Sequence, residues 1–206
     1  MNPLNSTIYT IGHGQKTAEE FIAELKAFDI QFLADVRTTP FSKWVHHFNK
    51  GVIEDILKSV GIRYLFMGNC IGGRPQNDTC YDNEGFFDYK LMAEEPKFKV
   101  GLSRLVDANS QHFRVAVMCS ETDPSECHRS KLIGRELYFN YNLDINHIVS
   151  IGKTISQSEV MTALTKGVWL PTGDLFGQCE PPYFKSRKVY NNIVNIEELN
   201  PIDLYD

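Results

Sequence analysis

The apolar positions of the chain follow two different spacings that alternate along its length. Residues 6–12 (STIYTIG) and 30–36 (IQFLADV) are short, mostly apolar runs, as in strands that are buried on both faces of a sheet. Between these runs, Phe21, Leu25 and Phe28 recur at helical spacing. The pattern predicts a strand, a helix and a second strand in succession.

The same alternation continues through most of the chain. Its order favours a parallel sheet covered by helices, so we predict a three-layer, mostly parallel, Rossmann-like α/β fold with helices on both faces. Residues 67–85, rich in Gly, Asn and Asp, show no periodicity and predict a long loop. The further predicted strands are residues 62–66, 114–119 and 146–150, and the further helices are residues 50–60, 86–95, 98–106 and 156–164.

Two helix starts carry capping signals. Thr17 with Glu20 three residues later is a capping box, and Asp123, Pro124 and Glu126 combine an N-cap, a proline at the first helical position and an acid at the third. The second signal predicts a helix that begins near residue 124. Its first turns would carry Cys127, His128 and Arg129.

The length of 206 residues and the 42% of apolar residues suit one generous domain. We predict an α/β domain over residues 1–165. Residues 166–206 contain several Pro and Gly residues, and we expect them to form an extension that packs on the domain or remains partly loose.

The charge and the cysteines of the chain indicate in which environment the protein works. Lys and Arg total 21 against 26 Asp and Glu, a net charge of -5, so no global basic field recruits nucleic acid. No apolar run is long enough to span a membrane, and the amino terminus lacks the pattern of a secretion signal. Five scattered cysteines suit free thiols, so we expect a reducing, cytoplasmic location.

Polar side chains follow three of the predicted strands, at the edge where ligands bind in open α/β sheets. If these strands are neighbours, their end residues converge on one site. The residues concerned are Gly12 and His13, Asp35 and Arg37, and Cys119 and Glu121.

Either Cys119 or Cys127 is a candidate nucleophile. A helix N-terminus, with His128 and Arg129 nearby, would lower the pKa of a thiol below about 8.5. Each cysteine could equally be a small buried hydrophobic residue, and the histidine and arginine could cap the helix or pair with acids. Asp35 and Arg37 likewise suit either anion binding or an internal ion pair; these alternatives remain open.

Zinc is a further alternative, because Cys119, Cys127 and His128, with His13 as a fourth group, offer soft ligands. The spacing contains neither a CxxC nor an HxxxH pair, which structural zinc sites usually show. We therefore expect no cofactor and keep zinc as a minority reading.

Two loops could contribute contacts to a ligand. Residues 41–50 mix aromatic and cationic or titratable side chains, which suits either base stacking or a half-buried lid. Gly73 and Arg74 could present backbone N–H groups and a cation to an anion. Nucleic-acid binding is possible on this composition, although a phosphorylated small molecule is easier to accommodate.

Several motifs together resemble the bacterial and archaeal domain-of-unknown-function family 488. They are YTIGHG, LADVRTTP, GIRYLFMGNCIGGRP and VAVMCSETDPSECHRSKLI, in this order over residues 8–137. The resemblance implies a compact α/β fold with one pocket built from these motifs, and it brings no reaction with it. The residues to which it assigns a site role are Gly12, His13, Asp35, Arg37, Gly73, Arg74, Cys119, Glu121, Cys127, His128 and Arg129.

From these residues we expect an enzyme, a hydrolase or transferase acting on a small anionic or nucleotide-like substrate. Cys119, His128, Glu121 and Asp35 would form the catalytic group, and Arg37 and Arg129 would hold the anion. Two alternatives stay open. One is a non-catalytic module that binds a nucleotide or a nucleic-acid end, and the other is a metal-dependent hydrolase.

Overall fold

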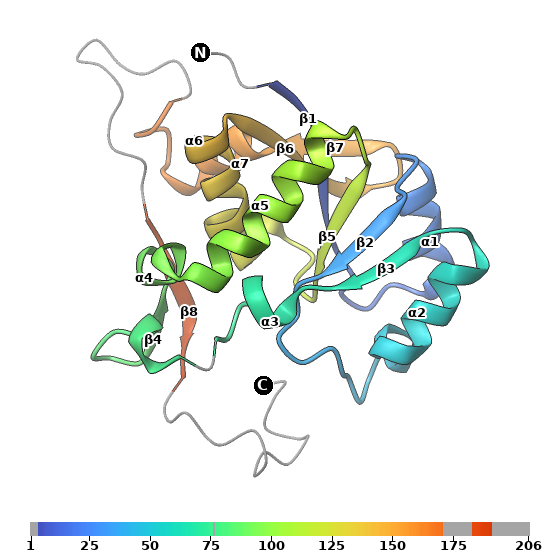
Figure 1. The fold of residues 1–206 in the computed structure, drawn as a ribbon, viewed down its shortest axis with the longest axis horizontal. Helices are drawn as coiled ribbons and strands as arrows, with labels where there is room; N and C mark the ends of the chain where they lie inside the picture. Colours follow the sequence, from blue (N-terminus) through green and yellow to red (C-terminus); the bar gives the residue numbers. More distant parts are fainter. Residues whose placement is uncertain (1–3, 76, 171–182, 191–206) are drawn as a thin grey trace.

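One six-stranded sheet organises the chain, in a computed structural model that describes residues 4–75, 77–170 and 183–190 (Figure 1). Neighbouring strands run parallel, except that the last two in the order are antiparallel. The prediction of a mostly parallel sheet is therefore confirmed. In order across the sheet, the strands are β3 (Arg63–Phe66), β2 (Phe32–Asp35), β5 (Val115–Cys119), β1 (Leu4–Gly12), β6 (Leu143–Ser150) and β7 (Lys153–Ser156).

Helices cover both faces of this sheet, so the predicted three-layer fold is confirmed. Successive side chains of β5 point to opposite faces, which places Ala116 and Met118 in one core and Val115 and Val117 in the other. Within the described residues, no helix is long and apolar enough to cross a membrane. One core is covered by α1 (Ala18–Lys26) and α2 (Lys50–Ser59), and the other by α4 (Tyr89–Glu94), α5 (Pro96–Ser110) and α6 (Arg135–Tyr141), while α7 (Gln157–Leu164) packs on β6 and α6.

Strand β5 lies between β1 and β2, although it follows both in the sequence by many residues. Gly12 pairs with Cys119, and Asp35 pairs with Met118. The ladder continues past the strand ends, where the His13 backbone N–H donates to the Cys119 carbonyl at 3.0 Å. The convergence on which the predicted site depends is therefore confirmed.

The region predicted as a helix over residues 86–95 is instead a short strand followed by a helix. Strand β4 (Phe86–Asp88) pairs with β8 (Lys185–Val189), and Asp88 then caps α4 by accepting from the backbone of Lys90. The pairing partner comes from the C-terminal extension, so helical spacing alone could not reveal it. The predicted long loop also contains a short helix, α3 (Gly68–Ile71), and a 3-10 turn at Asp78–Cys80.

The capping signal at Asp123 and Pro124 predicted a continuous helix, and this prediction is wrong. Pro124–Glu126 is a single 3-10 turn, after which Cys127 is extended with φ -120° and ψ 149°. The helix begins only after His128, as a π-helix at Arg129–Gly134 that continues into α6. Cys127 thus lies on a bend before the helix rather than in its first turn.

The close approach of β1 to the segment after β5 requires glycine at position 12. A Cβ atom added to Gly12 would lie 1.9 Å from the Glu121 carbonyl oxygen, a contact that only a backbone shift can relieve. The absence of a side chain is what lets the two segments touch.

We predict that Gly12→Ala lowers the free energy of unfolding by about 1–3 kcal/mol or more, because the added methyl group is overpacked against backbone. Urea unfolding measures the change. Gly51→Ala is the matched control, since no atom lies within 4 Å of its added Cβ and the residue is inside α2. The control should be as stable as the wild type or more stable; equal stability of both variants would contradict the close approach.

Candidate functional site

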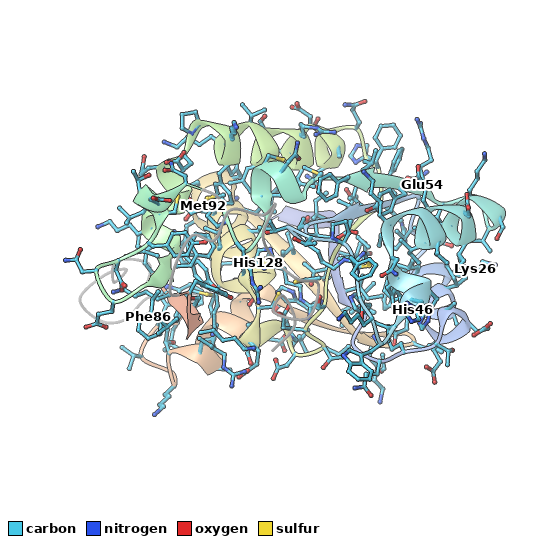
Figure 2. All side chains as sticks on the ribbon, turned by 90° about the horizontal axis from the view of Figure 1, so that it is seen from below. Lys26, His46, Glu54, Phe86, Met92 and His128 are labelled. Atoms are coloured by element: carbon cyan, nitrogen blue, oxygen red, sulfur yellow. The ribbon has the colours of Figure 1, made fainter. Side chains whose placement is uncertain are left out.

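A pocket of about 450 Å³ opens at the carboxyl ends of β2 and β5. In Figure 2, which views the molecule from below, His128 lies near the centre of the view. Of the residues predicted from sequence, the pocket is lined by Arg37, Gly73, Arg74, Cys119, Glu121, Cys127 and His128.

Two thiols and a carboxylate form the floor of the pocket. Glu121 Oε2 lies 2.7 Å from Cys119 Sγ and 3.3 Å from Cys127 Sγ. Both cysteines are buried, and the four cysteines of the described residues are free thiols. The extended backbone of Cys127 turns its side chain back towards the end of β5, so the bend that replaced the predicted helix creates this pair.

The imidazole of His128 completes the group. Its Nδ1 atom lies 3.7 Å from Cys119 Sγ and 3.6 Å from Cys127 Sγ. A Cβ atom added to Gly73 would lie 2.7 Å from Nδ1, so glycine at position 73 leaves room for the ring. Gly73 therefore contributes to the site because it has no side chain that would displace His128.

The two thiols have opposite acid strengths. A hydrogen bond from Cys127, reinforced by the charge of His128, lowers the pKa of Cys119 well below its usual value despite burial. Burial, and the negative charge on its neighbour, raise the pKa of Cys127 well above the usual value. Burial alone would lower the pKa of His128, but the Cys119 thiolate raises it. Of the two thiols, Cys119 is therefore the one that ionises more readily.

The proton between Cys119 and Glu121 belongs on the carboxyl oxygen when Cys119 is ionised. Glu121 is exposed as a whole, but its carboxyl end lies among buried groups. This desolvation, together with the charge of Cys119, raises the pKa of Glu121. A carboxylic acid that donates to the thiolate is the arrangement that agrees with both pKa shifts.

Asp35 and Arg37 form a buried ion pair at the end of β2. Arg37 Nε and Nη2 donate to the two Asp35 oxygens at 2.9 and 2.6 Å, and Tyr64 also donates to this carboxylate at 2.8 Å. Arg37 Nη2 donates further to the Phe48 carbonyl at 2.7 Å. Asp35 is fully buried behind the pocket, so its contacts suit the positioning of Arg37 better than direct catalysis.

His13 is held as a neutral ring beside this ion pair. Burial, and then the charge of Arg37, lower its pKa to about 4. Its Nδ1 lies 2.9 Å from the Gly14 carbonyl, its Nε2 lies 3.3 Å from Arg37 Nη1, and the ring stacks on Phe48. Both ring nitrogens are therefore engaged, which removes His13 from the group of possible metal ligands.

Arg129 lies beneath the pocket and does not line it. The side chain is fully buried, and Nη2 donates to the Thr122 carbonyl at 2.7 Å. Nε and Nη1 make no hydrogen bond to any described residue. Burial and the neighbouring Cys119 raise the pKa of Cys127, and the positive charge of Arg129 partly opposes this rise.

The sequence model for the domain of unknown function DUF488 matches residues 17–135. The chain belongs to the DUF488 family. The match includes both thiols, His128, Asp35 and Arg37, while Gly12 and His13 precede it. No curated protein and no solved structure matches the chain.

One wall of the pocket comes from outside the DUF488 match. Strand β8 contributes Ser186, Arg187 and Lys188, and Tyr190 follows. Arg187 forms an ion pair with Glu126, which ties this strand to the 3-10 turn before Cys127. Sequence reasoning missed these residues, because an exposed, charged strand without apolar alternation resembles a loop.

The aromatic loop at residues 41–50 does not line the pocket of this DUF488 protein. Trp44 is 85% exposed, and in Figure 2 His46 lies away from His128, towards α1 and α2. Phe48 is fully buried and contacts His13 and Phe21, and Ser42 is also buried. The loop therefore supports the Asp35–Arg37 pair through Phe48, and its most exposed side chain is Trp44.

We predict that Cys119 in reduced, chelator-treated protein reacts with iodoacetamide with an apparent pKa well below 8.5, because its thiolate is stabilised by Cys127 and His128. Mass spectrometry against pH identifies the modified cysteine. Cys127→Ala should raise this apparent pKa, and Cys80→Ser should leave it unchanged. A profile that rises only above about pH 8.5, or modification of Cys127 first, would contradict the assignment.

Proposed function

We propose that this DUF488 protein is an enzyme, a hydrolase or transferase, in which Cys119 is the nucleophile towards a small anionic or nucleotide-like substrate. The observation that carries the proposal is a cysteine sulfur 3.7 Å from an imidazole nitrogen at the floor of an open pocket, and the lowered pKa of Cys119 and the raised pKa of His128 favour a thiolate–imidazolium pair. This pairing is the activated form of a cysteine nucleophile. The free thiols suit the cytoplasm, which we retain as the expected compartment.

Catalysis would proceed in two displacements. The Cys119 thiolate attacks the electrophilic carbon or phosphorus atom and forms a bond to sulfur, while the bond to the leaving group breaks and His128 gives that group its proton. Water, or the hydroxyl of an acceptor, then attacks the same atom. His128 takes back the proton of the attacking hydroxyl, and the thiolate departs in its original state.

Charges around the pocket support an anionic substrate. Four cationic side chains line it against two carboxyl groups. Two of these cations are paired with carboxylates, Arg37 with Asp35 and Arg187 with Glu126, so these two pairs add no net charge to the wall. Burial raises the pKa of Glu121, which reduces its repulsion of an anion. The four cationic residues are Arg37, Arg74, Arg187 and Lys188.

We predict a burst of 4-nitrophenol, up to one equivalent per chain, with at least one of three probes: 4-nitrophenyl acetate, 4-nitrophenyl phosphate or bis(4-nitrophenyl) phosphate. Cys119→Ser should lower turnover at least about 1,000-fold, since a hydroxyl is a far weaker nucleophile here. Mass spectrometry of the quenched reaction should find the adduct on Cys119.

Lys188→Ala separates binding from chemistry, because this residue lies on the rim. It should raise KM for a phosphate probe and leave the iodoacetamide profile of Cys119 unchanged. Absence of turnover with all three probes, together with a thermal shift by adenosine monophosphate that Lys188→Ala removes, would instead favour the non-catalytic binding module.

A further inference from the structure

Three soft ligand atoms gather at one point of the pocket floor. Cys119 Sγ, Cys127 Sγ and His128 Nδ1 all lie within 4.8 Å of one another. In the described residues this is the group of three or more such side chains that could hold a metal ion. The sequence offered these three residues as soft ligands, but their spacing did not show that they meet, because Cys119 and Cys127 are eight positions apart and come together through the extended bend at Cys127.

The separations suit a tetrahedral zinc ion. Zinc lies about 2.3 Å from a thiolate sulfur and about 2.0–2.1 Å from an imidazole nitrogen, so a tetrahedral angle requires a sulfur-to-nitrogen separation of about 3.6 Å. The two observed separations are 3.7 and 3.6 Å. Both sulfur-to-nitrogen separations therefore match those of a tetrahedral ion, and the two sulfur atoms lie within 4.8 Å of each other.

We propose that Cys119, Cys127 and His128 bind one Zn²⁺ ion, with its fourth position open to the pocket. Three protein ligands and one open position are the arrangement of catalytic rather than structural zinc sites. All three residues line the pocket, so water or an anion can reach the fourth position. The site does not depend on the proposed reaction.

The surroundings of the ligands suit a bound cation. The Arg129 backbone N–H points at Cys127 Sγ at 3.5 Å, a contact that favours sulfur as a thiolate. Glu121 Oε2 lies 2.7 Å from Cys119 Sγ and 3.3 Å from Cys127 Sγ, so its carboxyl group is within hydrogen-bond reach of both sulfur ligands. His128 Nε2 is buried and has no partner among the described residues, so a neutral ring with its proton there leaves Nδ1 for the ion.

Zinc binding and nucleophilic attack would exclude each other. Both use the same electron pair on Cys119 Sγ, so a bound ion withdraws the thiolate from alkylation. The metal-free protein then carries the nucleophilic Cys119 thiolate, and the zinc form is a different chemical state of the same pocket, with a Lewis acid in place of the nucleophile.

The test is a titration of reduced, chelator-treated full-length protein with Co²⁺, which reports thiolate coordination by its charge-transfer absorption. We expect saturation at one equivalent, intense visible bands typical of a tetrahedral ion, and displacement by Zn²⁺. Cys127→Ser and His128→Gln should each weaken binding at least about 100-fold. Cys70→Ser, whose sulfur lies on α3 outside the pocket, should bind as the wild type does.

Circular dichroism of each variant verifies that it is folded. Absence of a thiolate-to-cobalt band at one equivalent, or an unchanged band in folded Cys127→Ser, would overturn the site. One equivalent of Zn²⁺ should also protect Cys119 from iodoacetamide, and failure to protect would equally count against it. Alkylation of the metal-free protein tests the nucleophile separately, so failure of one proposal is distinguishable from failure of the other.

Discussion

Insertion of β5 between β1 and β2 is the constraint on which the site depends. The register sets Gly12 beside Cys119 and carries the ladder on to His13, so the end of β5 is fixed by backbone hydrogen bonds on the β1 side. On the other side of β5, Asp35 of β2 pairs with Met118, the residue before Cys119. This fixed strand end places a cysteine at the floor of a pocket whose walls come from distant segments.

Most of the fold could be predicted from the sequence, but only part of the site could. Helical and strand spacing identifies elements such as α1 and β2, because each buries an apolar face. Spacing does not identify neighbours, so the meeting of Asp35, Gly12 and Cys119 stayed conditional until the sheet order was known. The capping signal at Asp123 did not predict the end of the turn that this residue caps. The turn ends at Cys127, where the chain bends and brings the Cys127 thiol to Cys119.

Arg37 and Arg129 were both predicted to hold the anion, but they lie in different places in the structure. Arg37 is neutralised by Asp35 and anchored to Phe48, so it is a rigid part of the wall. Arg129 is buried behind the thiols, where its charge acts at a distance. The cationic rim instead comes partly from β8, a strand with no apolar signal. Its attachment needs a partner strand, β4, more than ninety residues earlier in the chain.

The chemistry of the pocket depends on the ionisation of Cys119 at neutral pH while Cys127 keeps its proton. The direct measurement is the far-ultraviolet thiolate absorbance of metal-free protein against pH, taken as the difference between the wild type and Cys119→Ser. One thiolate should be present at neutral pH and should be lost only on acidification. A difference signal that develops only above about pH 8.5 would contradict it.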